Sequence, residues 1–258
     1  MKAIERLFDA ERPPLIEVSL RATLSEPVPI KLRLLDRFRR ALGDRFTEMD
    51  EAAQYEQVPG LPQNPIIMEP GALFGATFPA ANSSISVWLF TQMLVTRWSL
   101  RLDTKDTEYP GFEPLRAIHT HAIESLCNCL DAPVLVKVAN ISYLNFLSPD
   151  MVPLGIPGVF SPAAQLQIAT GATAIHKHEA AWKTRLGVDL RFTIENKAIV
   201  LLGEITQGFT LQTVAGYALP EGVPEGAGLD LARTVLKEFF PQLISASLKS
   251  RWHIKGTT

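Results

Sequence analysis

Two His-x-His pairs are the residues of this sequence best suited to chemistry, because imidazole binds metals and exchanges protons near neutral pH. His119 and His121 precede Glu124 in one segment, and His176 and His178 form the second pair. Helical ligands share a face only at spacings of three or four residues, which His121 and Glu124 satisfy and His119 does not. Zinc needs three or four convergent ligands, and no spacing brings the two pairs together. A metal-dependent enzyme using these four histidines is therefore an alternative function and not the favoured one.

Nucleophilic catalysis has little support in the sequence. Cys127 lies about two helical turns from His119 on an apolar stripe, where thiols are usually inert. Cys129 would point about 200° away from Cys127 on a helix, so the two cannot form a disulfide there. The chain also lacks a G-x-S-x-G turn and a glycine-rich phosphate loop. We assign no catalytic, metal-binding or cofactor-binding residue and favour a non-enzymatic protein.

One predicted helix, Lys31–Leu42, has a cationic face made of Arg33, Arg37 and Arg40. Its opposite, apolar stripe consists of Leu32, Leu35, Phe38 and Leu42. Charged outer faces are typical of amphipathic helices, so a solvated face is the first interpretation and a phosphate or partner contact is the second. A formal net charge of −2 argues against extensive nucleic-acid binding, which depends on neutralising phosphates.

The composition is that of a well-buried globular protein, with 47% hydrophobic and 20% charged residues in 258. Its longest apolar runs, such as Ile85–Phe90 and Ala198–Leu202, have the length of strands. They are far shorter than the roughly 20 residues that span a bilayer, so no membrane segment is predicted. Met1–Ala10 has no hydrophobic region of the signal-peptide kind. A cytoplasmic location is therefore expected.

Two parts of the chain repeat the same order of predicted elements. A β-branched strand follows a proline at Leu15–Leu24 and again at Val134–Leu144. Each is followed by extended segments and then by a long amphipathic helix, at Glu113–Leu130 and at Leu229–Trp252. Pro241 lies inside the last helix, where a proline bends a helix or begins a new one. The repetition concerns the order of elements and not the residues, so it indicates a weak structural duplication.

Shorter strands are predicted between these elements. Ile85–Phe90 and Leu94–Leu102 alternate apolar and polar residues on either side of a tight connection, which predicts a hairpin. In the second half we expect one long strand over Trp182–Ile194, a turn at Glu195–Lys197 and a returning strand over Ala198–Thr206.

These elements predict an α+β protein, and two arrangements fit them. One is a ferredoxin-like first half with the second half extending its sheet, and the other is a pair of tandem β-α-βββ-α modules. We favour the tandem modules, residues 1–131 and 132–258, because the two long helices then occupy equivalent places. The modules would share one mostly antiparallel curved sheet, form one compact unit and carry both long helices on one face, with Leu126 and Phe239 buried.

Three short motifs carry a resemblance to a known family. Arg12–Val18 contains two prolines and a glutamate, Tyr109–Glu113 precedes the middle helix, and Val138–Tyr143 lies on the next strand. The sequence thereby resembles a family distributed sporadically among bacteria and archaea, whose members open with a PP-x-x-E strand and carry Y-x-G-W/F before the middle helix. Where the family has R-Y-x-N, this chain has Val138-Ala139-Asn140 in place of the arginine–tyrosine pair. The resemblance implies a prokaryotic cytosolic protein of unknown function and no catalytic residue.

The architecture and the lack of a catalytic set favour a non-enzymatic binding or assembly protein, whose sheet face or strand edge contacts a protein partner. A small-molecule pocket between the sheet and the long helices is a further alternative. The last helix carries Ile244, Leu248 and Trp252 at spacings of four residues, beyond the length needed to cover a strand. Because an exposed apolar ridge is typical of symmetric dimers, we expect a homodimer with Ile244–Trp252 in the interface.

Overall fold

The chain forms a single antiparallel sheet with helices packed against it. The structure is a computed structural model, and it describes residues 15–51, 75–101, 108–152, 154–161, 177–201 and 204–252. The mixture of strands and helices confirms the predicted α+β class. Within the described part of the chain, no helix is both long enough and apolar enough to cross a membrane.

The strands are β1 (Leu15–Leu24), β2 (Asp50–Glu51), β3 (Gly75–Pro79), β4 (Ile85–Phe90), β5 (Met93–Ser99), β6 (Val136–Leu147), β7 (Lys177–Lys183), β8 (Val188–Leu201) and β9 (Glu204–Ala218). The helices are α2 (Leu32–Ala41), α3 (Phe112–Leu130), α4 (Ile156–Val159), α6 (Glu225–Leu243) and α7 (Ala246–Arg251), with a short 3₁₀ turn, η1 (Pro149–Met151). Helix α3 begins after Gly111, whose φ of 95° favours glycine, and ends at Asp131 in the left-handed conformation.

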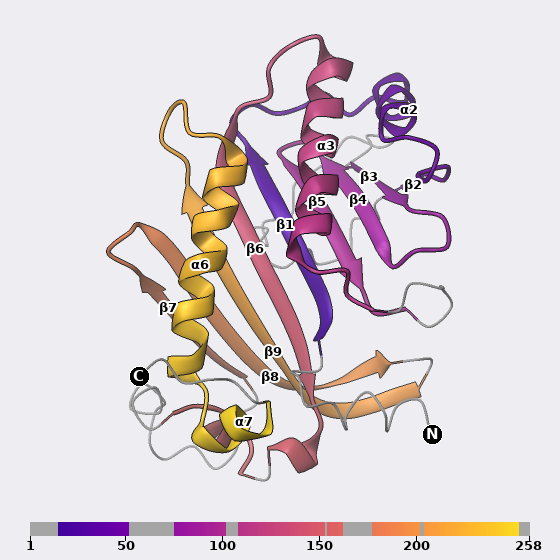
Figure 1. Ribbon diagram of the computed structural model, residues 1–258. Helices are drawn as coiled ribbons and strands as arrows, with labels where there is room; N and C mark the ends of the chain where they lie inside the picture. Colours follow the sequence, from indigo (N-terminus) through magenta and orange to yellow (C-terminus); the bar gives the residue numbers. More distant parts are fainter. Residues whose placement is uncertain are drawn as a thin grey trace.

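The nine strands lie in the order β2-β3-β4-β5-β1-β6-β9-β8-β7, and each pairs antiparallel with its neighbours. The strands of the first half therefore lie on one side of the β1–β6 pair and those of the second half on the other (Figure 1). Strands β1 and β6 match the predicted first strands of the two halves and are direct neighbours, with Leu20 opposite Ile141. The predicted hairpin is also confirmed, because β4 pairs with β5 across a two-residue turn at Thr91 and Gln92.

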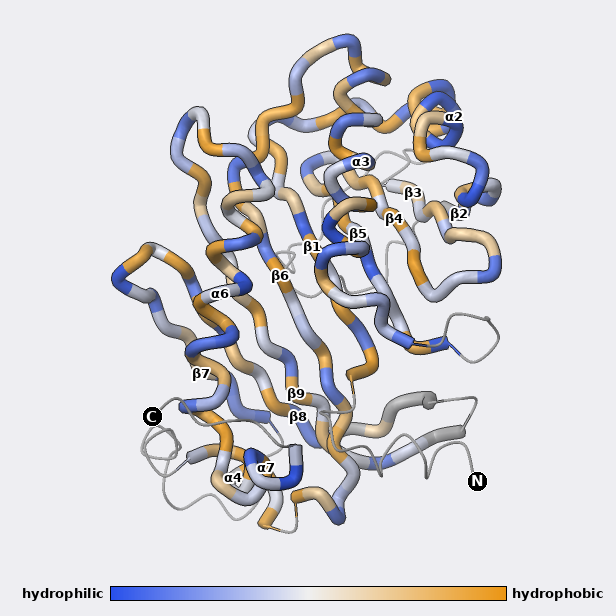
Figure 2. The backbone as a smooth tube through the Cα atoms, in the orientation of Figure 1, coloured by the Kyte–Doolittle hydropathy of each residue, from blue (hydrophilic) through white to orange (hydrophobic). Residues whose placement is uncertain are grey.

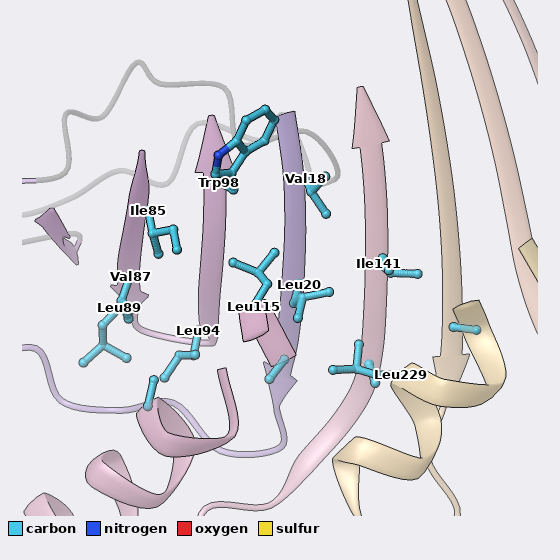
Figure 3. Packing of buried hydrophobic residues seen from close by; sticks show 14 of the residues in the cluster. Val18, Leu20, Ile85, Val87, Leu89, Leu94, Trp98, Leu115, Ile141 and Leu229 are labelled. Carbon is cyan, nitrogen blue, oxygen red and sulfur yellow. The ribbon is translucent and has the colours of Figure 1, made fainter. Parts of the chain in front are cut away.

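Both long helices cover the same face of this sheet, as the sequence predicted (Figure 1). Helix α3 packs on β5 and β1, and α6 packs on β6 and β9. Gly228 allows the close approach of α6, because a Cβ atom there would lie 3.2 Å from the Cβ of Ala139. The main core lies between helices and sheet and includes Leu20, Leu115 and Leu229 (Figure 3).

Strand β1 differs from the half-buried strand that its alternation predicts. Val18 and Leu20 face the helices and are fully buried, as expected. On the other face, however, Ser19 and Arg21 are only 2% and 5% exposed. Burial lowers the pKa of Arg21 to about 10, with nearby Glu17 opposing that shift. Both faces of β1 are therefore buried at these positions, although its alternation predicts one exposed, polar face.

The bounds predicted for the strands after β6 are wrong. The expected single strand Trp182–Ile194 is a hairpin, because β7 ends at Lys183 and β8 begins at Val188. Gly187, with φ of 79°, lies in the turn between them. The expected turn at Glu195–Lys197 is continuous strand within β8, and the returning strand β9 begins only at Glu204. The alternation of apolar and polar residues continues in phase through the turn at 184–187, so the sequence predicts one strand there. The three polar residues Glu195–Lys197 lie inside β8, although their polarity is typical of a turn.

The apolar ridge at the end of the chain is not a surface for dimerisation. Helix α6 passes through Pro241 and ends at Leu243, and α7 lies beyond this end of α6, at the bottom of Figure 1. Ile244, Leu248 and Trp252 are at most 3% exposed, within a second core. That core also contains Leu147, Met151, Val152, Ile156, Val159, Phe160, Ile194, Phe209 and Leu211. The predicted contribution of Ile244–Trp252 to a dimer is therefore wrong, because the ridge is used inside the chain.

Two further helix positions need correction. Leu126 is fully buried as predicted, but Phe239 is only partly buried, against the rings of Trp182 and Phe192. On α2, Leu35 and Phe38 are buried, whereas Leu32 at the first position is 65% exposed. Figure 2 shows hydrophobic and hydrophilic residues interleaved along α2.

Candidate functional site

The histidines do not form a metal site among the described residues. No group of three or more His, Cys, Asp or Glu side chains able to hold a metal occurs there. His119 is fully buried in the core, while His121 on the same helix is exposed. His178 lies on β7 with its ring 5.5 Å from that of Phe160, and burial lowers its pKa. His176 lies outside the described residues. The two His-x-His pairs therefore share no site that the structure describes.

Both cysteines are free thiols, in agreement with the sequence. Burial raises the pKa of the Cys129 thiol, which keeps it protonated and unreactive. The sulfur of Cys127 accepts a hydrogen bond from the backbone N–H of Val134, so it has a structural partner just past the end of α3.

Arg33, Arg37 and Arg40 are exposed on α2, as predicted. Arg37 forms a 3.5 Å ion pair with Asp131 at the end of α3, and Arg40 forms a 2.6 Å pair with Asp36 one turn earlier. Both pairs are solvent-exposed, so they contribute little to stability. The cationic face is therefore partly neutralised by its own neighbours, in accord with the solvated interpretation.

A denser group of polar and aromatic side chains lies between α3, α6 and the central strands, and we call it the interhelix cluster. Its members are Thr96, Trp98, Tyr109, Phe112, Glu113, His119, Tyr143, Glu225 and Arg233. They come from β5, the loop before α3, α3 itself, β6 and α6. Both halves of the chain thus contribute to it.

The inner part of the cluster is a buried chain of three side chains. Nδ1 of His119 lies 2.9 Å from Oγ1 of Thr96, and either atom can be the donor. On the other side of the ring, Nε2 lies 3.3 Å from Oε1 of Glu225. Thr96 and His119 are fully buried, and the Glu225 side chain is 9% exposed. This chain links a central strand through α3 to the first turn of α6.

The outer part of the cluster surrounds one guanidinium group with aromatic rings. Arg233 lies over the ring of Phe112 at 4.2 Å, in cation–π geometry, and its Nη1 donates a 2.9 Å hydrogen bond to Glu113. The ring of Trp98 lies 5.4 Å from that of Tyr109. The Arg233 side chain is 27% exposed and that of Glu113 is 64% exposed, so this part of the cluster reaches solvent.

Two tyrosine hydroxyls lie beside this guanidinium group. Burial raises the pKa of Tyr109 well above its usual range, and nearby Tyr143 raises it further while Arg233 lowers it. Burial likewise raises the pKa of Tyr143, again opposed by Arg233. Both hydroxyls therefore keep their protons at neutral pH and can donate hydrogen bonds.

Two ion pairs and one histidine–carboxylate contact connect α3 and α6 across this cluster. Glu113 pairs with Arg233, Nη1 of Arg116 lies 3.0 Å from Oδ1 of Asp230, and His119 faces Glu225. Positions rise along α3 as they fall along α6, which shows that the two helices run antiparallel. Gly226 gives Arg116 room, because a Cβ atom there would lie 3.1 Å from its Nη2.

Five buried polar atoms of the cluster have no properly aligned hydrogen-bond partner among the described residues. They are Nε1 of Trp98, Oη of Tyr109, Nε2 of His119, Oε1 of Glu225 and Nε of Arg233. An unpaired buried polar group costs about 1–3 kcal/mol, so several together in one place call for an explanation. Three of the five, on Trp98, Tyr109 and Arg233, are buried N–H or O–H donors, and of these residues Arg233 also has a partly exposed side chain, at 27%.

Hydroxyl, imidazole and carboxylate follow one another at Thr96, His119 and Glu225, which is also the order of an activated nucleophile. Complete burial of Thr96 in the middle of β5 prevents a substrate from reaching its hydroxyl. The inner chain therefore acts as a structural link, and the chemistry open to ligands lies at the outer end, in hydrogen-bond donation and ring contact.

Sequence reasoning missed most of this cluster. Tyr109 and Tyr143 were noted only as parts of short motifs, and Arg233 was not noted as a candidate. One signal was present: His119 interrupts the apolar stripe of α3 between Leu115 and Ala122. A polar residue at an inward position requires a buried partner, although the sequence does not say which one.

Comparisons with known proteins add no relative to this picture. No protein-family model matches the sequence, and a search of curated proteins found no match. Any functional proposal therefore depends on the site itself.

Proposed function

We propose that this protein is a non-enzymatic binding protein whose ligand is a small aromatic carboxylate, held at the outer end of the interhelix cluster. The observation that carries the proposal is the group of buried donors on Trp98, Tyr109 and Arg233, which have no well-aligned acceptor among the described residues, the hydroxyl of Tyr109 having only that of Tyr143 beside it. Ligand sites typically combine apolar, aromatic walls with a few convergent polar groups, and this is the composition of the cluster.

The donors favour an anionic oxygen as their partner. The indole N–H of Trp98 and the Nε–H of Arg233 can only donate, and the hydroxyl of Tyr109 keeps its proton. Hydrogen bonds from a guanidinium group to a carboxylate are among the stronger kinds found in proteins. A carboxylate with two oxygens would therefore satisfy donors that the protein leaves unpaired.

The walls favour a flat, apolar body on the ligand. The ring of Phe112 lies against Arg233, Tyr109 and Tyr143 lie near the guanidinium group, and the ring of Trp98 packs on that of Tyr109. Aromatic pairs gain about 0.5–1.5 kcal/mol beyond the burial of their area, which favours an aromatic ring over an aliphatic chain of similar size.

The position of the cluster fits a duplicated architecture, and we propose that residues 1–131 and 132–258 are tandem modules. The strand order β3-β4-β5-β1 in one half has the same form as β7-β8-β9-β6 in the other. Helix α3 follows β5 and α6 follows β9, and the two helices run antiparallel. The ligand would then lie at the junction of the modules, with Trp98 and Tyr109 from one and Arg233 from the other.

Thermal unfolding with phenylacetate tests the ligand class. At a concentration of 100 times its Kd, a ligand of the native state stabilises it by about 2.7 kcal/mol. For a protein of this size that corresponds to a rise in Tm of roughly 5 °C. Phenylacetamide, which has the same ring and no charge, is the matched control and should give a much smaller rise. Equal shifts with the two compounds, or no shift with several ring-bearing acids, would contradict the proposal.

The other expected contacts stay predictions. A protein partner at a sheet face or strand edge, and a phosphate or partner contact at Arg33, Arg37 and Arg40, are compatible with a ligand-binding protein. The exposure of these arginines supports the second of them. Their ion pairs with Asp36 and Asp131 weaken it, because an anion would compete with those carboxylates.

A further inference from the structure

The carboxylate of Glu113 lies between the two arginines that bridge α3 and α6. Its Oε1 accepts the 2.9 Å hydrogen bond from Nη1 of Arg233, and its Oε2 lies 3.5 Å from Nη1 of Arg116. Arg116 in turn lies 3.0 Å from Oδ1 of Asp230. These four side chains carry two positive and two negative charges, so their charges cancel. A ligand that brought only a carboxylate would leave the group with a net negative charge.

Glu113 and the proposed ligand would share one guanidinium group. Glu113 accepts from Nη1 of Arg233, whereas the buried Nε of the same group has no well-aligned acceptor among the described residues. Both nitrogens are bonded to the same carbon, so a ligand carboxylate at Nε would lie only a few ångströms from the carboxylate of Glu113. Like charges so close together repel each other. A simple aromatic acid would therefore bind against the charge of Glu113.

Glu113 can also accept hydrogen bonds from a cation. An ionised carboxylate offers about four lone-pair sites on its two oxygens, and the contacts with Arg233 and Arg116 involve one oxygen each. The side chain is 64% exposed, so a ligand can reach it. An ammonium group on the carbon next to the ligand's carboxylate would lie on the Glu113 side of Arg233. Such a group turns the repulsion into a charge-assisted hydrogen bond.

We propose that Glu113 is a specificity-determining residue and that the ligand is an aromatic α-amino acid. The inference rests on the proposed function, because it requires Arg233 to hold the ligand's carboxylate. The ring lies among the aromatic neighbours of Arg233, and the α-ammonium group donates to Glu113. A zwitterion brings no net charge, so the balance of charges between α3 and α6 is kept. Glu113 then discriminates between ligands that differ only in the ammonium group.

Calorimetric titration of the full chain with phenylacetate and phenylglycine tests this role, because the two compounds differ only in the α-ammonium group. Each enantiomer of phenylglycine is titrated separately. The wild type should bind the better enantiomer roughly tenfold more tightly than phenylacetate, the gain from about one charged hydrogen bond. Glu113→Gln keeps the size of the side chain and removes its charge. It should weaken phenylglycine and strengthen phenylacetate, so that the preference falls to about twofold or less.

Asp230→Asn is the matched control. It removes a carboxylate from the same bridge, on a side chain that is 48% exposed, but Asp230 contacts Arg116 and not Arg233. This variant should keep the preference of the wild type for phenylglycine. If neither compound bound to the wild type, the proposed function would fail and this inference with it. If both bound, but with the same preference in the wild type and Glu113→Gln, or with the preference lost equally in Asp230→Asn, the role of Glu113 would be wrong while the carboxylate site remained.

Discussion

Leu126→Ala should lower the free energy of unfolding by about 2–5 kcal/mol, because it removes a buried side chain and leaves a cavity. Leu126 is fully buried on α3, the helix that packs on both α2 and the central strands. The surrounding side chains belong to the sheet and to two helices, so they cannot easily close around the space. Denaturant unfolding followed by circular dichroism measures the change.

Two other positions control that measurement. Leu32→Ala removes the same atoms from a residue that is 65% exposed, so it should change stability by no more than about 0.5 kcal/mol. Phe239→Ala should fall between the two, because Phe239 is partly buried on the aromatic group around Trp182. If Leu126→Ala cost no more than Leu32→Ala, the packing of α3 described above would be wrong.

The second large effect is expected from His119 and Glu225, because each is the other's buried partner. His119→Leu leaves the buried carboxylate of Glu225 facing an apolar group, and Glu225→Leu does the same to Nε2 of His119. Each single change should therefore cost about 1–3 kcal/mol. Replacing both residues by leucine removes the unpaired groups together, so the double variant should lose less than the sum.

A double-mutant cycle from urea unfolding of the four proteins gives the coupling energy directly. The structure predicts a coupling of about 1 kcal/mol or more, favouring the intact pair. Additive losses in the double variant would show that His119 and Glu225 do not interact across the two helices.

Local patterns in the sequence predicted those elements in which the apolar positions of the pattern are also the buried ones. Strand β1 has the predicted bounds, and α3 begins one residue before the predicted helix, because the apolar periods of both segments match how they pack. In β8 the alternation failed, since Glu195 to Lys197 are polar residues inside a strand that pairs with β9 along its whole length. The ends of such a strand depend on its pairing with distant segments, and a local sequence pattern does not predict them.

The interhelix cluster could not be predicted from the sequence because its members are distant along the chain. Tyr109 and Arg233 meet only once β1 and β6 pair and place α3 beside α6. Similarly, the ridge at Ile244 to Trp252 looked exposed because the residues of its second core, among them Met151 and Phe160, lie in a proline-rich stretch with little periodicity.

The central claim is that Arg233 and its aromatic neighbours hold a small aromatic carboxylate. Calorimetric titration of phenylacetate into the wild type, Arg233→Met and Arg116→Met tests it most directly. Both arginines bridge α3 and α6 with side chains about equally exposed, at 27% and 32%, but only Arg233 belongs to the aromatic group. We predict that Arg233→Met weakens binding by at least about tenfold, the loss of roughly one charged hydrogen bond, and that Arg116→Met binds like the wild type. Equal affinity in all three proteins, or no binding to the wild type, would contradict the account.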